Sequence, residues 1–152
     1  MTQFGSNPPK YIKTWEAHAG VVITNPNLVL LKAHPEWRPQ RYVSYLWAMP
    51  NQDNLCVGIE TQVAAGHARE VTDATRQGYG HPTLTGGGNA LYGGELLYKP
   101  SRGGWLINGA SGRFGRSGVP VIHGMRMRQA QKLFLELINL PVVIDEYEVR
   151  NG

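Results

Sequence analysis

The most informative stretch of this chain is residues 90–108, which read ALYGGELLYKPSRGGWLIN. Its two ends, 90–98 and 104–108, are rich in aromatic and branched apolar residues, and the five residues between them include Pro100 and Gly103. Two such runs joined by a short segment with proline and glycine are typical of paired β-strands. The stretch therefore predicts a hairpin within an antiparallel sheet.

Helix and strand patterns continue outward from this hairpin. Apolar residues recur at helical spacing over 125–139, which predicts a helix that Asn139 and Pro141 end, and a last strand follows over 142–149. Toward the N-terminus, the pattern predicts a helix over 63–77, strands over 55–61 and 41–49, and a hairpin over 20–33 with its turn at Asn25-Pro26-Asn27. This order predicts an α+β fold, a mostly antiparallel, glycine-rich sheet with one or two helices packed on a face.

The length and composition fit one domain. The chain has 152 residues, of which 41% are hydrophobic, and no linker divides it. We expect a single domain over 1–152, with an extended arm over 1–13 and a glycine-rich block over 78–118 that holds 13 of the 19 glycines. Cys56 is the only cysteine, which excludes an intramolecular disulfide, and its apolar surroundings in the sequence predict a core residue rather than a nucleophile.

The sequence also bears on where the protein acts. No apolar run reaches the roughly 18 residues of a membrane span, and residues 1–10 lack the apolar core of a signal peptide. We therefore expect no membrane span and synthesis in the cytoplasm. Export from the cell would require a specialised secretion system that uses no cleaved signal.

The positive charge of the chain is concentrated in one region. The net charge is +4, and residues 96–144 contain seven lysines and arginines against one acid, Glu136. Arginine, with its planar fork of donors, suits phosphate and carboxylate groups. The excess of positive charge over residues 96–144 fits either a solvated basic face or a site for an anionic partner such as a nucleotide or RNA.

The glycine-rich block holds polar residues that exceed the needs of tight turns. His81 is followed by the hydroxyls of Thr83 and Thr85 and then by three glycines. Glu95 is a lone carboxylate in an apolar strand, and such a group is costly to bury unless it is paired or used in chemistry. These residues form the first half of a predicted cleft.

A loop further along the block supplies the second half. Ser111-Gly112-Arg113 offers backbone N–H groups beside a cation, which suits an anion such as phosphate, and Asn108 lies just before it. The structural alternative for Glu95 is an ion pair with Arg102 or Arg113. We expect an anion-accepting cleft lined by His81, Thr83, Glu95, Ser111 and Arg113.

Three parts of the block resemble a known pattern: His-Ser/Thr-Ser/Thr-Leu, then a glycine pair and Ala-Gly-Glu, then Asn-x-Ser-Gly-His-Tyr. The matching residues are 81–84, 93–96 and 108–114, with Arg113 and Phe114 in place of the usual His-Tyr. The pattern is similar to one shared by C-terminal domains of bacterial polymorphic toxins and secreted effectors, and by plant IQ-motif proteins. The resemblance covers about 40 of the 152 residues. It implies a secreted effector or toxin domain, for which a cognate immunity protein is an expected partner.

This context favours transfer of ADP-ribose from NAD. Such transferases resemble a pattern of an arginine on an early strand, a Ser/Thr-rich strand and a late Glu-x-Glu, and Arg41, residues 83–85 and residues 146–148 stand in that order. We hypothesise nucleotide-dependent group transfer with Glu95 and His81 as catalytic residues and NAD as the nucleotide. The predicted substrate ligands are Thr83, Thr85, Asn108, Ser111, Arg113 and Arg41.

Two alternatives stay open. One is a metal-independent ribonuclease in which His81, Glu95 and Arg113 supply the acid, the base and the phosphate contact, while aromatic residues such as Trp105 stack on bases. The other is a partner-binding module without chemistry. No metal is expected, because one cysteine excludes a zinc deaminase site and no His-Glu-x-x-His occurs. The other histidines are expected on the surface or on helix faces: His18, His34, His67 and His123.

Overall fold

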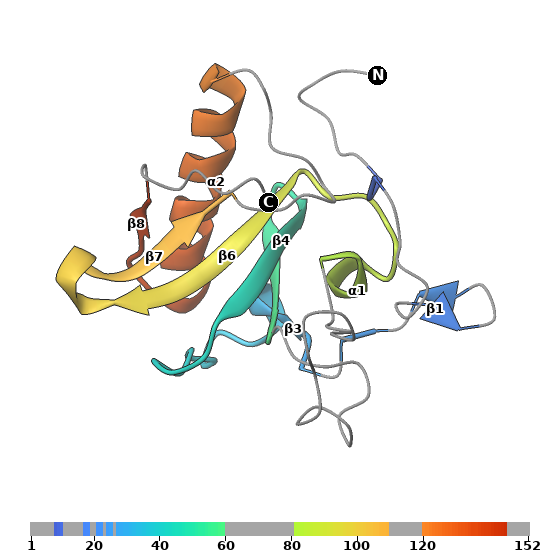
Figure 1. Ribbon diagram of the computed structural model, residues 1–152, viewed down its shortest axis with the longest axis horizontal. Helices are drawn as coiled ribbons and strands as arrows, with labels where there is room; N and C mark the ends of the chain where they lie inside the picture. The colour runs from blue at the N-terminus through green and yellow to red at the C-terminus, as the bar shows by residue number, and fades with distance from the viewer. Residues whose placement is uncertain are drawn as a thin grey trace, which may run out of the picture.

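The structure, a computed structural model, describes residues 8–10, 17–18, 21–22, 24–25, 27–59, 81–109 and 120–145. Its main feature is a six-stranded sheet in the order β3-β5-β4-β6-β7-β8 (Figure 1). The strands are β3 (Val29–Leu30), β4 (Tyr45–Asn51), β5 (Asn54–Ile59), β6 (Tyr92–Lys99), β7 (Gly104–Asn108) and β8 (Val143–Ile144). Helices α1 (Pro82–Thr85) and α2 (Pro120–Ile138) pack on it, which confirms the predicted α+β fold.

The predicted hairpin lies inside this sheet, between β4 and β8. Strands β6 and β7 pair antiparallel from Glu95 opposite Asn108 to Lys99 opposite Gly104. Gly103 and Gly104 turn the chain with φ values of 108° and 111°, a left-handed region that favours glycine. Every pairing in the six-stranded sheet is antiparallel except the one between β7 and β8, which is parallel.

Helix α2 covers one face of the sheet (Figure 1). It begins at Pro120, five residues before the predicted start, because proline is tolerated in the first turn of a helix. Its buried stripe includes Phe134, which meets Trp47 of β4 edge to face with ring centroids 6.4 Å apart. The helix ends before Asn139, whose φ of 57° is left-handed, in agreement with the predicted stop.

The short helix α1 lies against the opposite face, over β4 and β5. Its Leu84 packs with Leu46, Ala48 and Cys56, the residues of β4 and β5 that point away from α2. Cys56 is 2% exposed, and burial raises the pKa of its thiol to about 12. The thiol therefore stays protonated at neutral pH, as a core residue would.

The predicted hairpin over 20–33 is wrong. Strand β2 (Val21–Val22) pairs with β1 (Ala17–His18) in a separate two-stranded sheet, whereas β3 pairs with β5. The side chain of Asn25 explains the change of direction, because its Nδ2 donates to the Ile59 carbonyl, 3.1 Å away, at the end of β5. The segment is thereby attached to the main sheet instead of folding back on itself.

Other boundaries also differ from the prediction. The strand predicted over 41–49 begins only at Tyr45 and runs on to Asn51, and residues 41–42 lie in a turn. The predicted helix over 63–77 lies outside the described residues, as do most of the arm over 1–13 and the end of the last predicted strand, 146–149.

Candidate functional site

The predicted site residues Glu95 and Asn108 meet where β6 and β7 come closest. A Cβ atom added to Gly94 would lie 1.7 Å from the backbone oxygen of Asn108, so only glycine allows this approach. The Asn108 side chain then reaches Glu95 twice. Its Oδ1 accepts the Glu95 backbone N–H at 3.0 Å, and its Nδ2 donates to the Glu95 Oε1 at 3.0 Å. The second glycine of the Gly-Gly-Glu sequence is therefore required by the geometry that orients the carboxylate.

The Glu95 carboxylate is oriented but not neutralised by a described cation. Its side chain is half-buried, on the face of the sheet opposite α2, and its position in the register is beside Leu46. Among the described residues no lysine or arginine forms an ion pair with it. Arg102, one of the two predicted partners, instead binds Asp145. The predicted ion pair between Glu95 and Arg102 is therefore wrong. The Glu95 carboxylate has no counter-charge among the described residues.

Two further side chains hold β6 in place at Glu95. The His81 ring donates from Nε2 to the Gly94 carbonyl at 2.9 Å, and the Trp47 indole donates to the Glu95 carbonyl at 3.1 Å. His81 is 6% exposed and Thr83, two residues on, is fully buried. Both residues belong to the layer formed by α1. The described contact of His81 is with the backbone of β6, and this contact positions the strand that carries Glu95.

The remaining predicted ligands divide into three groups. The Thr85 hydroxyl lies 3.0 Å from the Gly88 carbonyl and 3.3 Å from the Pro82 carbonyl, and so closes the turn after α1. Arg41 lies across the sheet from Glu95, with its guanidinium carbon 4.7 Å from the ring centroid of Tyr98. Tyr98 and Leu96 lie on the face of β6 that packs toward α2, whereas Glu95 lies on the other face. Ser111 and Arg113 lie outside the described residues.

The α2 face of the same strand carries a polar group that the sequence did not predict. The Tyr92 hydroxyl lies 2.6 Å from Nδ1 of His123 on α2, and Arg126 is buried one turn further along the helix. A Cβ atom at Gly109 would lie 2.9 Å from the His123 ring and 3.1 Å from the Tyr92 ring. A glycine directly after Asn108 therefore lets these two rings pack against the end of β7.

A sequence signal for this second group did exist. Ile122, Arg126, Ala130 and Phe134 are spaced by four, and side chains at this spacing share one face of a helix. Because three of the four are apolar, the spacing places Arg126 on the buried stripe. His123 lies on a helix face, as expected of it, but it also contacts Tyr92.

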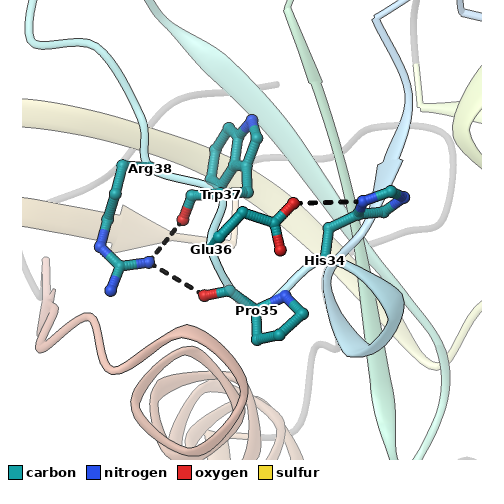
Figure 2. A network of polar contacts seen from close by, with 5 residues as sticks. All are labelled: His34, Pro35, Glu36, Trp37 and Arg38. Atoms are coloured by element: carbon teal, nitrogen blue, oxygen red, sulfur yellow. Dashed lines mark hydrogen bonds and ion pairs between the residues drawn. The ribbon is translucent and has the colours of Figure 1, made fainter.

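A shallow cavity of about 290 Å³ lies elsewhere, beside Trp37 and Arg38. Figure 2 shows the loop that borders it, in which the Arg38 guanidinium donates to the carbonyls of Pro35 and Trp37 at 3.1 and 2.7 Å. His34 faces Glu36 across 3.5 Å in the same loop. Arg38 is engaged by its own loop, so two carbonyl groups already use donors that its guanidinium could offer to a ligand.

In the described part of the chain, no cluster of three or more histidine, cysteine or acidic side chains is arranged to hold a metal ion. None of the helices described is long and apolar enough to cross a bilayer. No family model matches the chain, and searches among curated proteins and solved structures return no similar protein.

Proposed function

We propose that this chain is a secreted effector or toxin domain that transfers a group from a nucleotide such as NAD, with Glu95 as the catalytic carboxylate. The observation that carries the proposal is the contact between Glu95 and Asn108, which fixes the carboxylate at 3.0 Å without a described cation to neutralise it. The resemblance of residues 81–114 to effector domains supports the biological setting. Export without a cleaved signal and a cognate immunity protein belong to that setting.

The chemistry of the transfer explains why an oriented carboxylate is useful. Transfer from NAD breaks the bond between nicotinamide and ribose, nicotinamide leaves with the bonding electrons as a neutral base, and a nucleophile of the acceptor molecule forms the new bond to the ribose carbon. Positive charge develops on the ribose as the first bond lengthens. A fixed negative charge at that place stabilises the transition state more than the ground state. Asn108 holds Glu95, and His81 holds the strand that carries it, so both are assigned positioning roles. Arg113 and Ser111 remain the proposed ligands of the pyrophosphate.

Calorimetric titration of the purified chain with NAD tests substrate binding. We expect saturable binding that weakens at least about tenfold in Arg113→Ala, since a charge-assisted contact to phosphate contributes roughly 1.5–3 kcal/mol. Arg128→Ala, which removes an exposed arginine of α2, is the matched control and should bind as the wild type does. Absence of heat at millimolar NAD would refute the choice of nucleotide and leave the ribonuclease and the partner-binding module as the surviving functions.

The ribonuclease alternative is favoured by one separate observation. Arg41 stacks on Tyr98, and the Tyr98 ring contacts Trp105 with centroids 5.1 Å apart. Lys99 follows Tyr98 directly, so aromatic faces and cations lie together at this end of the β6–β7 hairpin. Such a combination suits a single-stranded nucleic acid, whose bases stack and whose phosphates pair with cations.

Titration with labelled RNA at several salt concentrations tests this alternative. Affinity should fall as salt rises, and Arg41→Gln should reduce the slope of log K against log salt by about one if Arg41 contacts a phosphate. Lys132→Gln, on the exposed side of α2, serves as the control. An affinity that does not depend on salt would eliminate RNA as the partner.

A further inference from the structure

Arg126 of α2 is a charged residue on the buried side of the helix. It lies between Ile122 and Ala130 on the stripe that packs against the sheet, and it is 4% exposed. Arginines are rarely buried to this extent unless their donors are paired. The pattern of the helix would accommodate an apolar side chain here, so the charge needs an explanation.

The guanidinium of Arg126 is incompletely paired. Its Nη1 donates to the Gln129 side chain at 2.8 Å, while its Nη2 is buried and has no hydrogen-bond partner. No described carboxylate forms an ion pair with Arg126. Burial lowers the pKa of the guanidinium from its ordinary value, an effect that the nearby Tyr92 partly offsets. A buried donor of this kind costs free energy until an acceptor reaches it.

The surroundings of Arg126 are suited to an anion. Tyr92 is close enough to Arg126 to act on its charge, and His123, which is bonded to Tyr92, precedes Arg126 by one helical turn. The first turn of α2 lies about two turns before Arg126, and the N–H groups of a first turn lack intrahelical acceptors and carry the positive end of the helix dipole. Gly109 brings the end of β7 against the same two rings. Among the ion pairs of the described residues, none brings an acidic side chain to Arg126 or His123.

We propose that Arg126, Tyr92 and His123 form a binding site for a phosphoryl group between the start of α2 and the end of β7. The Arg126 fork supplies a charge-assisted contact through Nη2, and the helix start adds backbone donors. Phosphate is chosen over a carboxylate because its tetrahedral oxygens can accept from the guanidinium and from the helix start at the same time. This site lies on the α2 face of β6, whereas Glu95 lies on the other face.

The proposal does not depend on the group-transfer chemistry. Binding of inorganic phosphate at Arg126 is measured without NAD, and loss of a Glu95 reaction leaves that binding untouched. A nucleoside monophosphate is the second probe. If free phosphate and the monophosphate both stabilise the protein, the site accepts phosphate esters; if only free phosphate does, it takes the inorganic ion.

Thermal unfolding in increasing phosphate tests the site, with sodium chloride at matched ionic strength as the reference. We expect the unfolding midpoint of the wild type to rise by about 3 °C or more at saturation. Arg126→Met should abolish this rise, and it should unfold at a higher temperature than the wild type in the absence of phosphate, because an unsatisfied buried donor has been removed. Arg128→Gln, two residues along the helix and exposed, should retain the full rise.

Each outcome of this experiment decides the proposal. An equal rise in wild type and Arg126→Met, a loss of the rise in Arg128→Gln, or no rise in the wild type overturns it. If Arg126→Met does not fold, Arg126→Lys replaces it, since lysine keeps the charge but lacks the fork. A phosphate-dependent rise in Arg126→Lys as large as that of the wild type would then overturn the proposal.

Discussion

Glu95→Gln should lower the rate of NAD turnover by about 100-fold or more while leaving the unfolding midpoint nearly unchanged. Glutamine has the shape of glutamate, and its Oε1 can still accept the Asn108 amide that now lies 3.0 Å from the carboxylate. The substitution therefore removes the negative charge and keeps the geometry. An assay of nicotinamide release, run beside thermal unfolding, measures both quantities.

The control for this prediction is Glu136→Gln. Glu136 is an exposed carboxylate of α2 that faces Lys132 across 3.8 Å, so its loss should change neither turnover nor stability by a measurable amount. Expression in bacteria adds a cellular readout, in which the wild type should slow growth and Glu95→Ala should not. Wild-type turnover in Glu95→Gln would contradict the assignment of Glu95 as the catalytic carboxylate.

Gly94→Ala should reduce the free energy of unfolding by about 3 kcal/mol or more. The added Cβ would lie 1.7 Å from the Asn108 backbone oxygen and 3.0 Å from the Trp47 ring, and a backbone atom inside a sheet has little freedom to move. Strands β6 and β7 would have to separate at Asn108. For a chain of this size, such a loss lowers the unfolding midpoint by about 6–12 °C.

Gly86→Ala is the matched comparison for Gly94→Ala. Gly86 has a φ of 62° with no atom within 4 Å of an added Cβ, so alanine there meets conformational strain but no collision. The expected loss is about 1–2 kcal/mol, the cost of a left-handed residue with a side chain. Equal losses from the two substitutions, measured by urea unfolding, would show that Gly94 is not held by close packing.

Sequence patterns predicted correctly the elements that are held by contacts between residues close together in the chain. The hairpin of β6 and β7 and the helix α2 follow from alternation and helical spacing within a few residues. Strand β3 could not be placed in this way, because its partner β5 lies more than 20 residues further along the chain and the decisive contact is an asparagine side chain. Periodicity carries no information about such a contact.

The candidate site was predictable in part, for the same reason. Glu95 and Asn108 stood out as polar residues in an apolar hairpin, and strand pairing sets them opposite each other. Arg41 was assigned by order along the chain alone, and the structure places it on the other face of the sheet, against Tyr98. Arg126 was counted only as part of a basic stretch, because the composition of a segment does not reveal which of its charges is buried.

The short outer strands of the six-stranded sheet have a consequence for behaviour at high concentration. Strands β3 and β8 contribute two residues each, so the regular outer strand at either end of the described sheet is short. Unpaired backbone along a long, flat outer strand is the usual template on which copies of a protein add to one another as fibrils. With so short an outer strand at both ends of the described sheet, growth of this sheet from one molecule into the next is disfavoured, so a concentrated solution of the protein should not form cross-β aggregates through it.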